Sequence, residues 1–86
     1  MDMQLKDARV IVTAGASGIG REIVQAFHDE GARIATCDID EAALEALRDD
    51  LPGIHAAICD VSDPAAAAVF VADAIAHLGG LDTLVN

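Results

Sequence analysis

Three glycines between Thr13 and Gly20, in the stretch TAGASGIG, have the spacing best suited to chemistry in this sequence. Glycine lets backbone N–H groups approach an anion closely, and a helix that starts at such a turn adds partial positive charge. Together these features can cradle a pyrophosphate, with the Ser17 hydroxyl as a further donor. The candidate contact residues in this turn are Ala14, Gly15, Ser17, Gly18, Ile19 and Gly20.

The residues on either side of the turn predict a strand and a helix. Residues 8–12 form an apolar run rich in β-branched side chains, which is typical of a buried parallel strand. A helix is expected from about Gly18 to Glu30, with Gly31 as its terminating glycine. Its apolar side has helical spacing: Gly20, Ile23, Val24 and Phe27. Glycines alone are weak evidence, and their place between a strand and a helix strengthens the pyrophosphate interpretation.

The same alternation continues along the chain. After a polar lead-in of residues 1–7, strands are expected at 8–12, 32–37, 54–59 and 81–86, and helices at 18–30, 40–51 and 64–78. Either Ser62 or Asp63 caps the third helix, ahead of Pro64. The buried side of the second helix is predicted as Leu44, Leu47 and Leu51. The inner face of the third is predicted as Ala68, Val71, Ala72, Ile75 and Leu78.

The order βαβαβαβ predicts an α/β fold with a parallel sheet, right-handed crossovers and helices on both faces. In the doubly wound, Rossmann-type arrangement the strand order is 3-2-1-4. The carboxyl ends of parallel strands meet at one edge, where ligands bind. This edge is expected to gather the glycine turn, Asp38, Asp60 and Asn86.

Asp38 lies directly after the second strand, 18 residues beyond Gly20. A carboxylate there can accept hydrogen bonds from the ribose hydroxyls of an adenosine and would repel a 2′-phosphate, so NAD is favoured over NADP. The absence of a basic residue at Ser17 or Ile39 points the same way. A solvated acid at the end of a strand or at the start of a helix is the alternative for Asp38. Asp60 could equally belong to the capping cluster of the third helix.

The sequence resembles the short-chain dehydrogenase/reductase family at four places in the right order. TAGASGIG is similar to the TGxxxGIG signature, and Asp38 to the acidic residue of NAD-preferring members. Cys59-Asp60-Val61 resembles the segment that holds the adenine, and residues 81–86, LDTLVN, the start of the LDxLVNNAG strand. The resemblance implies that Asp60 and Val61 hold the adenine and Asn86 the ribose region. Ile39 joins the candidate cofactor-binding residues.

Two departures from the family pattern stand out. Ala14 occupies the first motif glycine, and if that position needs positive φ, Ala costs about 1 kcal/mol relative to Gly. We expect Gly15 beside it to take up the turn. The family's catalytic Ser, Tyr and Lys come after the last strand of this sequence, which contains no Tyr. No catalytic residue is therefore assigned. Residues 1–86 are interpreted as the N-terminal part of a single NAD-binding domain, whose fourth strand would lie inside a larger sheet.

The expected function is that of an NAD(H)-dependent oxidoreductase interconverting a small-molecule alcohol and a carbonyl. An S-adenosylmethionine-dependent methyltransferase is one alternative, although its glycines usually follow GxGxG, whereas these follow GxxGxG. A non-catalytic nucleotide-binding regulator is another. The resemblance also implies a homo-oligomer in the complete enzyme.

Composition narrows the partners and the compartment. A net charge of −10 with five Lys and Arg argues against nucleic acid and anionic membranes. No apolar run approaches the ~20 residues that span a bilayer, and no signal-peptide core is present, so we expect a cytoplasmic protein. Cys37 and Cys59 are then expected to be neighbouring free thiols. The scattered histidines and the absence of CxxC predict no metal site.

Overall fold

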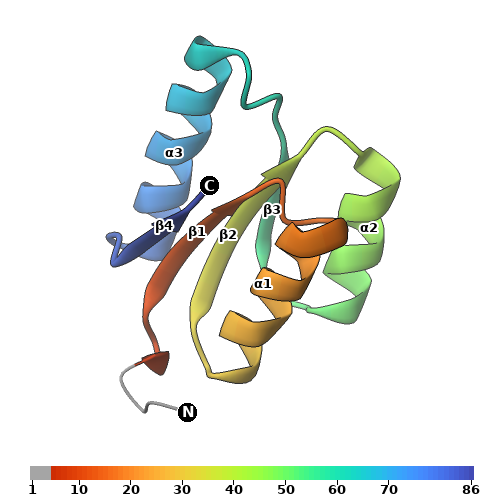
Figure 1. Cartoon of the computed structure of the whole chain (residues 1–86). Helices are drawn as coiled ribbons and strands as arrows, with labels where there is room; N and C mark the ends of the chain where they lie inside the picture. Colours follow the sequence, from red (N-terminus) through yellow and green to blue (C-terminus); the bar gives the residue numbers. More distant parts are fainter. Residues whose placement is uncertain (1–4) are drawn as a thin grey trace.

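Strands and helices alternate along residues 5–86, the part of the chain that the computed structural model describes (Figure 1). They are β1 (Arg9–Thr13), α1 (Gly18–Asp29), β2 (Arg33–Asp38), α2 (Glu41–Asp50), β3 (His55–Ile58), α3 (Pro64–Leu78) and β4 (Thr83–Val85). The four strands form one parallel sheet in the order β3-β2-β1-β4. The predicted fold class and strand order are confirmed. Residues 1–4 of the predicted lead-in lie outside the described residues.

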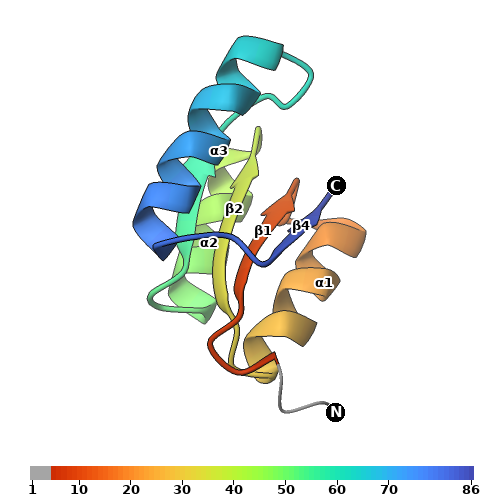
Figure 2. The ribbon, with the colours of Figure 1, turned by 90° about the vertical axis from the view of Figure 1, so that its left-hand side faces the viewer.

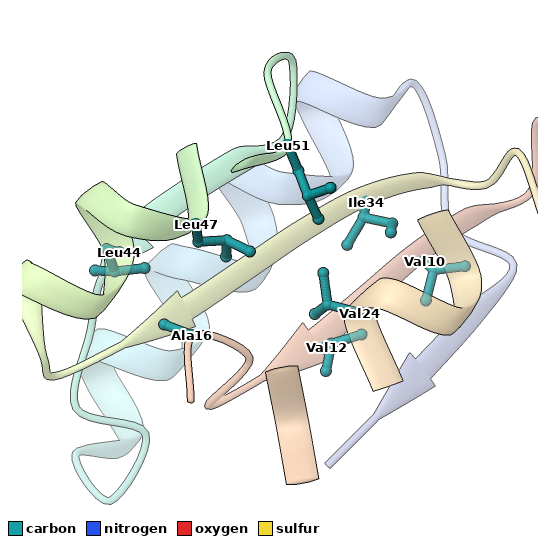
Figure 3. Close-up of a cluster of buried hydrophobic side chains, with 8 residues drawn as sticks. All are labelled: Val10, Val12, Ala16, Val24, Ile34, Leu44, Leu47 and Leu51. Atoms are coloured by element: carbon teal, nitrogen blue, oxygen red, sulfur yellow. The ribbon is translucent and has the colours of Figure 1, made fainter. Parts of the chain in front are cut away.

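Two apolar clusters cover opposite faces of the sheet, because successive strand residues point to opposite sides. Val10 and Val12 face α1 and α2, whereas Ile11 faces α3. Figure 2 shows α1 and α3 on opposite sides of the strands. Figure 3 shows the α1/α2 cluster, whose buried members are Val10, Val12, Ala16, Val24, Ile34, Leu44, Leu47 and Leu51. The predicted buried side of α2 is thus confirmed.

The prediction for the inner face of α3 is partly wrong. The residues that α3 buries are Phe70, Ala74 and Leu78. Val71 and Ile75 are half-buried, but Ala68 and Ala72 are exposed. Almost the whole circumference of α3 is apolar, so its periodicity does not set which side faces the sheet. Phe70, its largest apolar side chain, gains most from burial and fixes the rotation.

Side chains at the ends of the helices define the loops. The Asp63 carboxylate accepts from Ala65 N–H and Ala66 N–H, at 3.0 and 3.3 Å, so Asp63 rather than Ser62 caps α3. Asp40 caps α2 in the same way, through Ala43 N–H. These caps fix where α2 starts after β2 and where α3 starts after the loop that follows β3.

An ion pair fastens β4 to β1. The Arg9 guanidinium donates to both carboxylate oxygens of Asp82 at 3.0 Å, and one of its nitrogens also donates to Gly79 O. Arg9 N–H donates to the same carboxylate. Among the described residues, β1 is the one strand that pairs with β4, in the register Ile11 opposite Leu84. This contact therefore fixes the start of β4 against the start of β1.

The outer edge of β3 is covered by a side chain of α2. Cys59 N–H donates to Asp38 O across the β2–β3 ladder, so by strand alternation the Ala56 carbonyl points away from β2. The Arg48 guanidinium donates to this carbonyl at 2.7 Å. Because an unpaired strand edge is a template for another strand, Arg48 protects the middle of β3. No helix among residues 5–86 is long and apolar enough to cross a bilayer.

Candidate functional site

The predicted site residues gather at the edge of the sheet formed by the carboxyl ends of the strands. There β1 runs into the glycine turn, β2 ends at Asp38, and the loop carrying Asp60 follows β3. The end of β4 lies beside the end of β1 (Figure 1). The parallel order of the sheet thus brings together the turn and the acidic residues of distant segments, as the sequence predicts.

Ala14, and not Gly15, takes the left-handed conformation in the turn. Its φ is +54°, so our expectation that Gly15 would absorb the turn is wrong. Gly15 is needed for another reason: a Cβ there would overlap Thr36 Oγ1, because the turn packs directly on β2. A Cβ on Gly20 would overlap the Ala14 carbonyl oxygen, so Gly20 lets α1 approach the turn closely. Gly15 and Gly20 therefore allow the turn to pack closely against β2 and α1.

The first turn of α1 is open to a ligand. Ser17 stands at the N-cap with extended backbone, and its hydroxyl makes no capping hydrogen bond. No acidic side chain lies in this turn, and Ser17, Gly18 and Ile19 are all exposed. Because the first N–H groups of a helix have no partner within it, this end suits an anion such as a pyrophosphate.

The Asp38 carboxylate is held between the turn and the start of α2. It is only 8% exposed; Oδ2 accepts from Ala16 N–H at 3.1 Å and Oδ1 from Asp40 N–H at 3.1 Å. A carboxylate has about four acceptor positions, so two remain for the hydroxyls of a ribose. The alternative of a freely solvated acid is wrong. The contact with Ala16 also fastens the turn to β2, a role that the sequence did not indicate.

Asp60 organises the loop ahead of α3. Its Oδ1 accepts from the Ser62 hydroxyl at 2.6 Å and from Ser62 N–H at 2.9 Å, and these bonds lower the pKa of Asp60. Asp60 therefore belongs to the loop structure and does not cap the helix itself. Val61 and Ile39, which follow Asp60 and Asp38 in sequence, are 44% and 71% exposed. Apolar side chains exposed at this edge suit the faces of a flat aromatic base.

Thr13 is a residue of this edge for which the sequence predicted no role. Its hydroxyl lies 3.4 Å from both the Val85 carbonyl oxygen and Asn86 Oδ1, so it links the ends of β1 and β4. Thr36 similarly donates to Val12 O from a fully buried position. The available signal was a hydroxyl-bearing residue within otherwise apolar strands, since a buried hydroxyl needs a partner.

Neither of two clefts in the described chain is lined by the glycine turn or by Asp38, although the second reaches Cys59, next to Asp60. One of about 210 Å³ opens at the opposite ends of the strands, and one of about 470 Å³ lies between β3 and α3. We refer to the edge that carries the glycine turn, Asp38, Asp60 and Asn86 as the ledge. Within residues 5–86, no three His, Cys, Asp or Glu side chains are grouped to hold a metal ion. The open helix end, the close-packed glycines and the fixed carboxylate together fit a dinucleotide.

Comparison with known proteins identifies the class to which this ledge belongs. Residues 8–86 match the family model described as short chain dehydrogenase, and the chain belongs to that family. Membership argues against the methyltransferase alternative.

Three similar proteins show how much of the family architecture the chain contains. An L-fucose dehydrogenase of Bos taurus is 43% identical over 90% of this chain and 28% of that protein. A 2-dehydro-3-deoxy-L-rhamnonate dehydrogenase (NAD(+)) of a Sphingomonas strain is 39% identical over 87% of this chain and 30% of that protein. The crystal structure of a hydroxysteroid dehydrogenase from Escherichia coli superposes with a TM-score of 0.85 at 30% identity, covering 95% of this chain and 36% of that one. The chain thus spans about a third or less of the length of these relatives.

Proposed function

We propose that this chain is the cofactor-binding part of an NAD(H)-dependent oxidoreductase that interconverts a small-molecule alcohol and a carbonyl. The observation that carries the choice of NAD is the buried Asp38 carboxylate, fixed by Ala16 N–H at the edge of the sheet. A 2′-phosphate would meet this charge without a basic residue at Ser17 or Ile39 to offset it. The relative from Sphingomonas, whose name includes NAD(+), supports the same choice.

Each group on the ledge has a binding task in this proposal. The N-terminus of α1 and the Ser17 hydroxyl hold the pyrophosphate, and the free acceptor positions of Asp38 hold the adenosine ribose. Ile39 and Val61 flank the adenine beside Asp60. Asn86, linked to Thr13, supports the ribose region. When bound, the dinucleotide supplies hydride transfer, and this part of the chain orients it.

The proposed setting follows from the charge of the chain and the family. With a net charge of −10, the protein acts on a small molecule and binds neither nucleic acid nor an anionic membrane. We further propose a cytoplasmic protein that forms a homo-oligomer in its complete form.

Cofactor titration of the complete protein tests the proposal. NAD should bind more tightly than NADP, and Asp38→Ala should weaken NAD by about 10- to 100-fold, the loss of hydrogen bonds to a charged group. Asp38→Ala also removes the acceptor of Ala16 N–H and so loosens the turn, which should weaken the binding of NAD and NADP equally. Loss of the repulsion between Asp38 and the 2′-phosphate should instead change the ratio of the two affinities. Asp49→Ala removes the same charge from an exposed site on α2 and serves as the control.

Two results would contradict the proposal. Tighter binding of NADP than of NAD by the unaltered protein would overturn the assignment of the cofactor. Binding of NAD without turnover of any alcohol or carbonyl would favour the non-catalytic regulator. Reduction of NAD, followed by absorbance with a panel of simple alcohols, distinguishes the two functions.

A further inference from the structure

Two histidines meet where the C-terminal end of α3 lies against the start of β3, at the end of the strands opposite to the ledge. His55 is the first residue of β3, and His77 lies in the last turn of α3. Their rings are stacked, with centroids 4.3 Å apart and planes at 25°. No residue of the proposed cofactor site touches this pair, so a role for the two histidines goes beyond the proposed function.

The charged groups around the pair are unevenly distributed. Asp73, one turn before His77 on α3, lines the same cleft as His55. On the other side, His77 shares a cleft with His28 of α1 and Arg33 of β2. The Arg33 guanidinium donates to the Leu78 carbonyl at 3.0 Å, and His28 Nδ1 lies 3.8 Å from Asp29. A positive charge on either ring therefore lies near one carboxylate, that of Asp73, and near two permanent cations, Arg33 beside His77 and Arg48, which donates to the carbonyl of Ala56 next to His55.

We propose that the His55–His77 pair makes the docking of the C-terminal end of α3 on β3 sensitive to pH, so that acidification loosens this end of the helix. Neutral imidazole rings stack favourably. Two protonated rings at 4.3 Å repel each other, and the half-buried His55 loses part of its hydration. Other polar contacts at this end are the bonds from Arg33 to Leu78 O and from Arg9 to Gly79 O.

The direction of the effect follows from the environment of His55. Burial and the neighbouring His77 lower the pKa of His55 below its usual value of 6.5, although Asp73 opposes the shift. The folded state then binds fewer protons than the unfolded state near that pH. The docked helix is consequently most stable above pH 6.5, and it loses stability as the pH falls from 6.5 through the lower folded pKa.

Titration of the histidine rings by NMR in the full chain, with amide exchange along α3, tests the proposal. His77→Phe keeps an aromatic ring against His55 but carries no charge, so it should shift the titration midpoint of His55 upward. His28→Phe makes the same change at a histidine outside the pair and should leave that midpoint unchanged. Between about pH 7.5 and about pH 5.5, amide protection in the last turn of α3, corrected for intrinsic rates, should fall in the unaltered protein and fall less in His77→Phe, in which His55 is still buried but has no charged neighbour at position 77.

The proposal is overturned if His55 has the same midpoint with and without the charge at position 77, or if protection of α3 does not change with pH. Should His77→Phe fail to fold, His55→Phe removes the charge from the other ring. Protection of α3 must then become independent of pH, and a persistent fall would overturn the proposal.

Discussion

Replacing Ala14 by glycine should stabilise the fold, although the same replacement destabilises most other positions. Ala14 has φ of +54° and an exposed side chain, so its methyl group contributes little packing. An L-residue in this conformation costs about 1–2 kcal/mol, which glycine recovers. Glycine also gives the unfolded chain more freedom, at a cost of about 0.4–1 kcal/mol. The difference predicts a net gain of about 0.8 kcal/mol for Ala14→Gly.

The surrounding residues hold this strain in place. The backbone of Gly15 lies so close to β2 that a Cβ there would overlap Thr36 Oγ1. Gly20 brings α1 against the Ala14 carbonyl oxygen, which fixes the direction of that peptide group. The backbone of Ala14 therefore stays left-handed whether the residue is Ala or Gly.

Urea unfolding followed by circular dichroism measures the gain, with Ala72→Gly as the matched control. Ala72 is exposed in the middle of α3, so its change to Gly should cost about 1 kcal/mol. The two variants carry the same chemical change and should differ in unfolding free energy by about 1.8 kcal/mol, with unchanged denaturant dependence. If Ala14→Gly destabilises the chain as much as Ala72→Gly does, the strain at Ala14 is refuted.

Other parts of the structure predict further measurable effects. The hydrogen bonds from Arg9 lower the pKa of Asp82 from 3.8 to about 2, so this pair stabilises the fold above pH 3.8 and fails as the pH falls through about 2. Urea unfolding of Asp82→Asn should accordingly depend less on pH between about 4 and about 2, and an unchanged slope would contradict the pairing. Gly20→Ala should lose about 3 kcal/mol in the same assay, since its Cβ would overlap a backbone oxygen, and a neutral result would exclude that close approach. Cys37 and Cys59 are both buried and free, and burial raises the pKa of Cys37 to about 11. A thiol reagent should count two groups in unreduced, denatured protein and react slowly before denaturation; a count of zero would reveal a disulfide.

The elements and their order could be predicted from the sequence because their signals are local. The valines of β1, the leucines of α2 and the terminating glycines each act within a few residues, and parallel topology follows from their alternation. The side of α3 that packs on the sheet could not be predicted. Ala68 and Ala72 are as apolar as Ala74, so tertiary packing of Phe70 chose the buried face.

At the candidate site, residue types were predictable and their contacts were not. Spacing placed Asp38 at the ledge, but its bond to Ala16 joins residues 22 positions apart through the packing of β1 on β2. The left-handed backbone of Ala14 depends on Thr36 and Gly20, which close the space around Gly15 and the Ala14 carbonyl. Such contacts arise only when strands and helix are assembled.

The position of Arg48 predicts how loss of its side chain would affect the behaviour of the protein in solution. Its guanidinium occupies the outward carbonyl of Ala56 at the middle of the β3 edge, far from the glycine turn. Loss of this side chain leaves the ledge intact but offers β3 to the strands of neighbouring molecules. Loss of the Arg48 side chain should thus make the protein insoluble at high concentration, while the monomer that stays in solution keeps its affinity for the ligand. For a designer who wished to extend the sheet with an added strand, Arg48 is the first residue to replace.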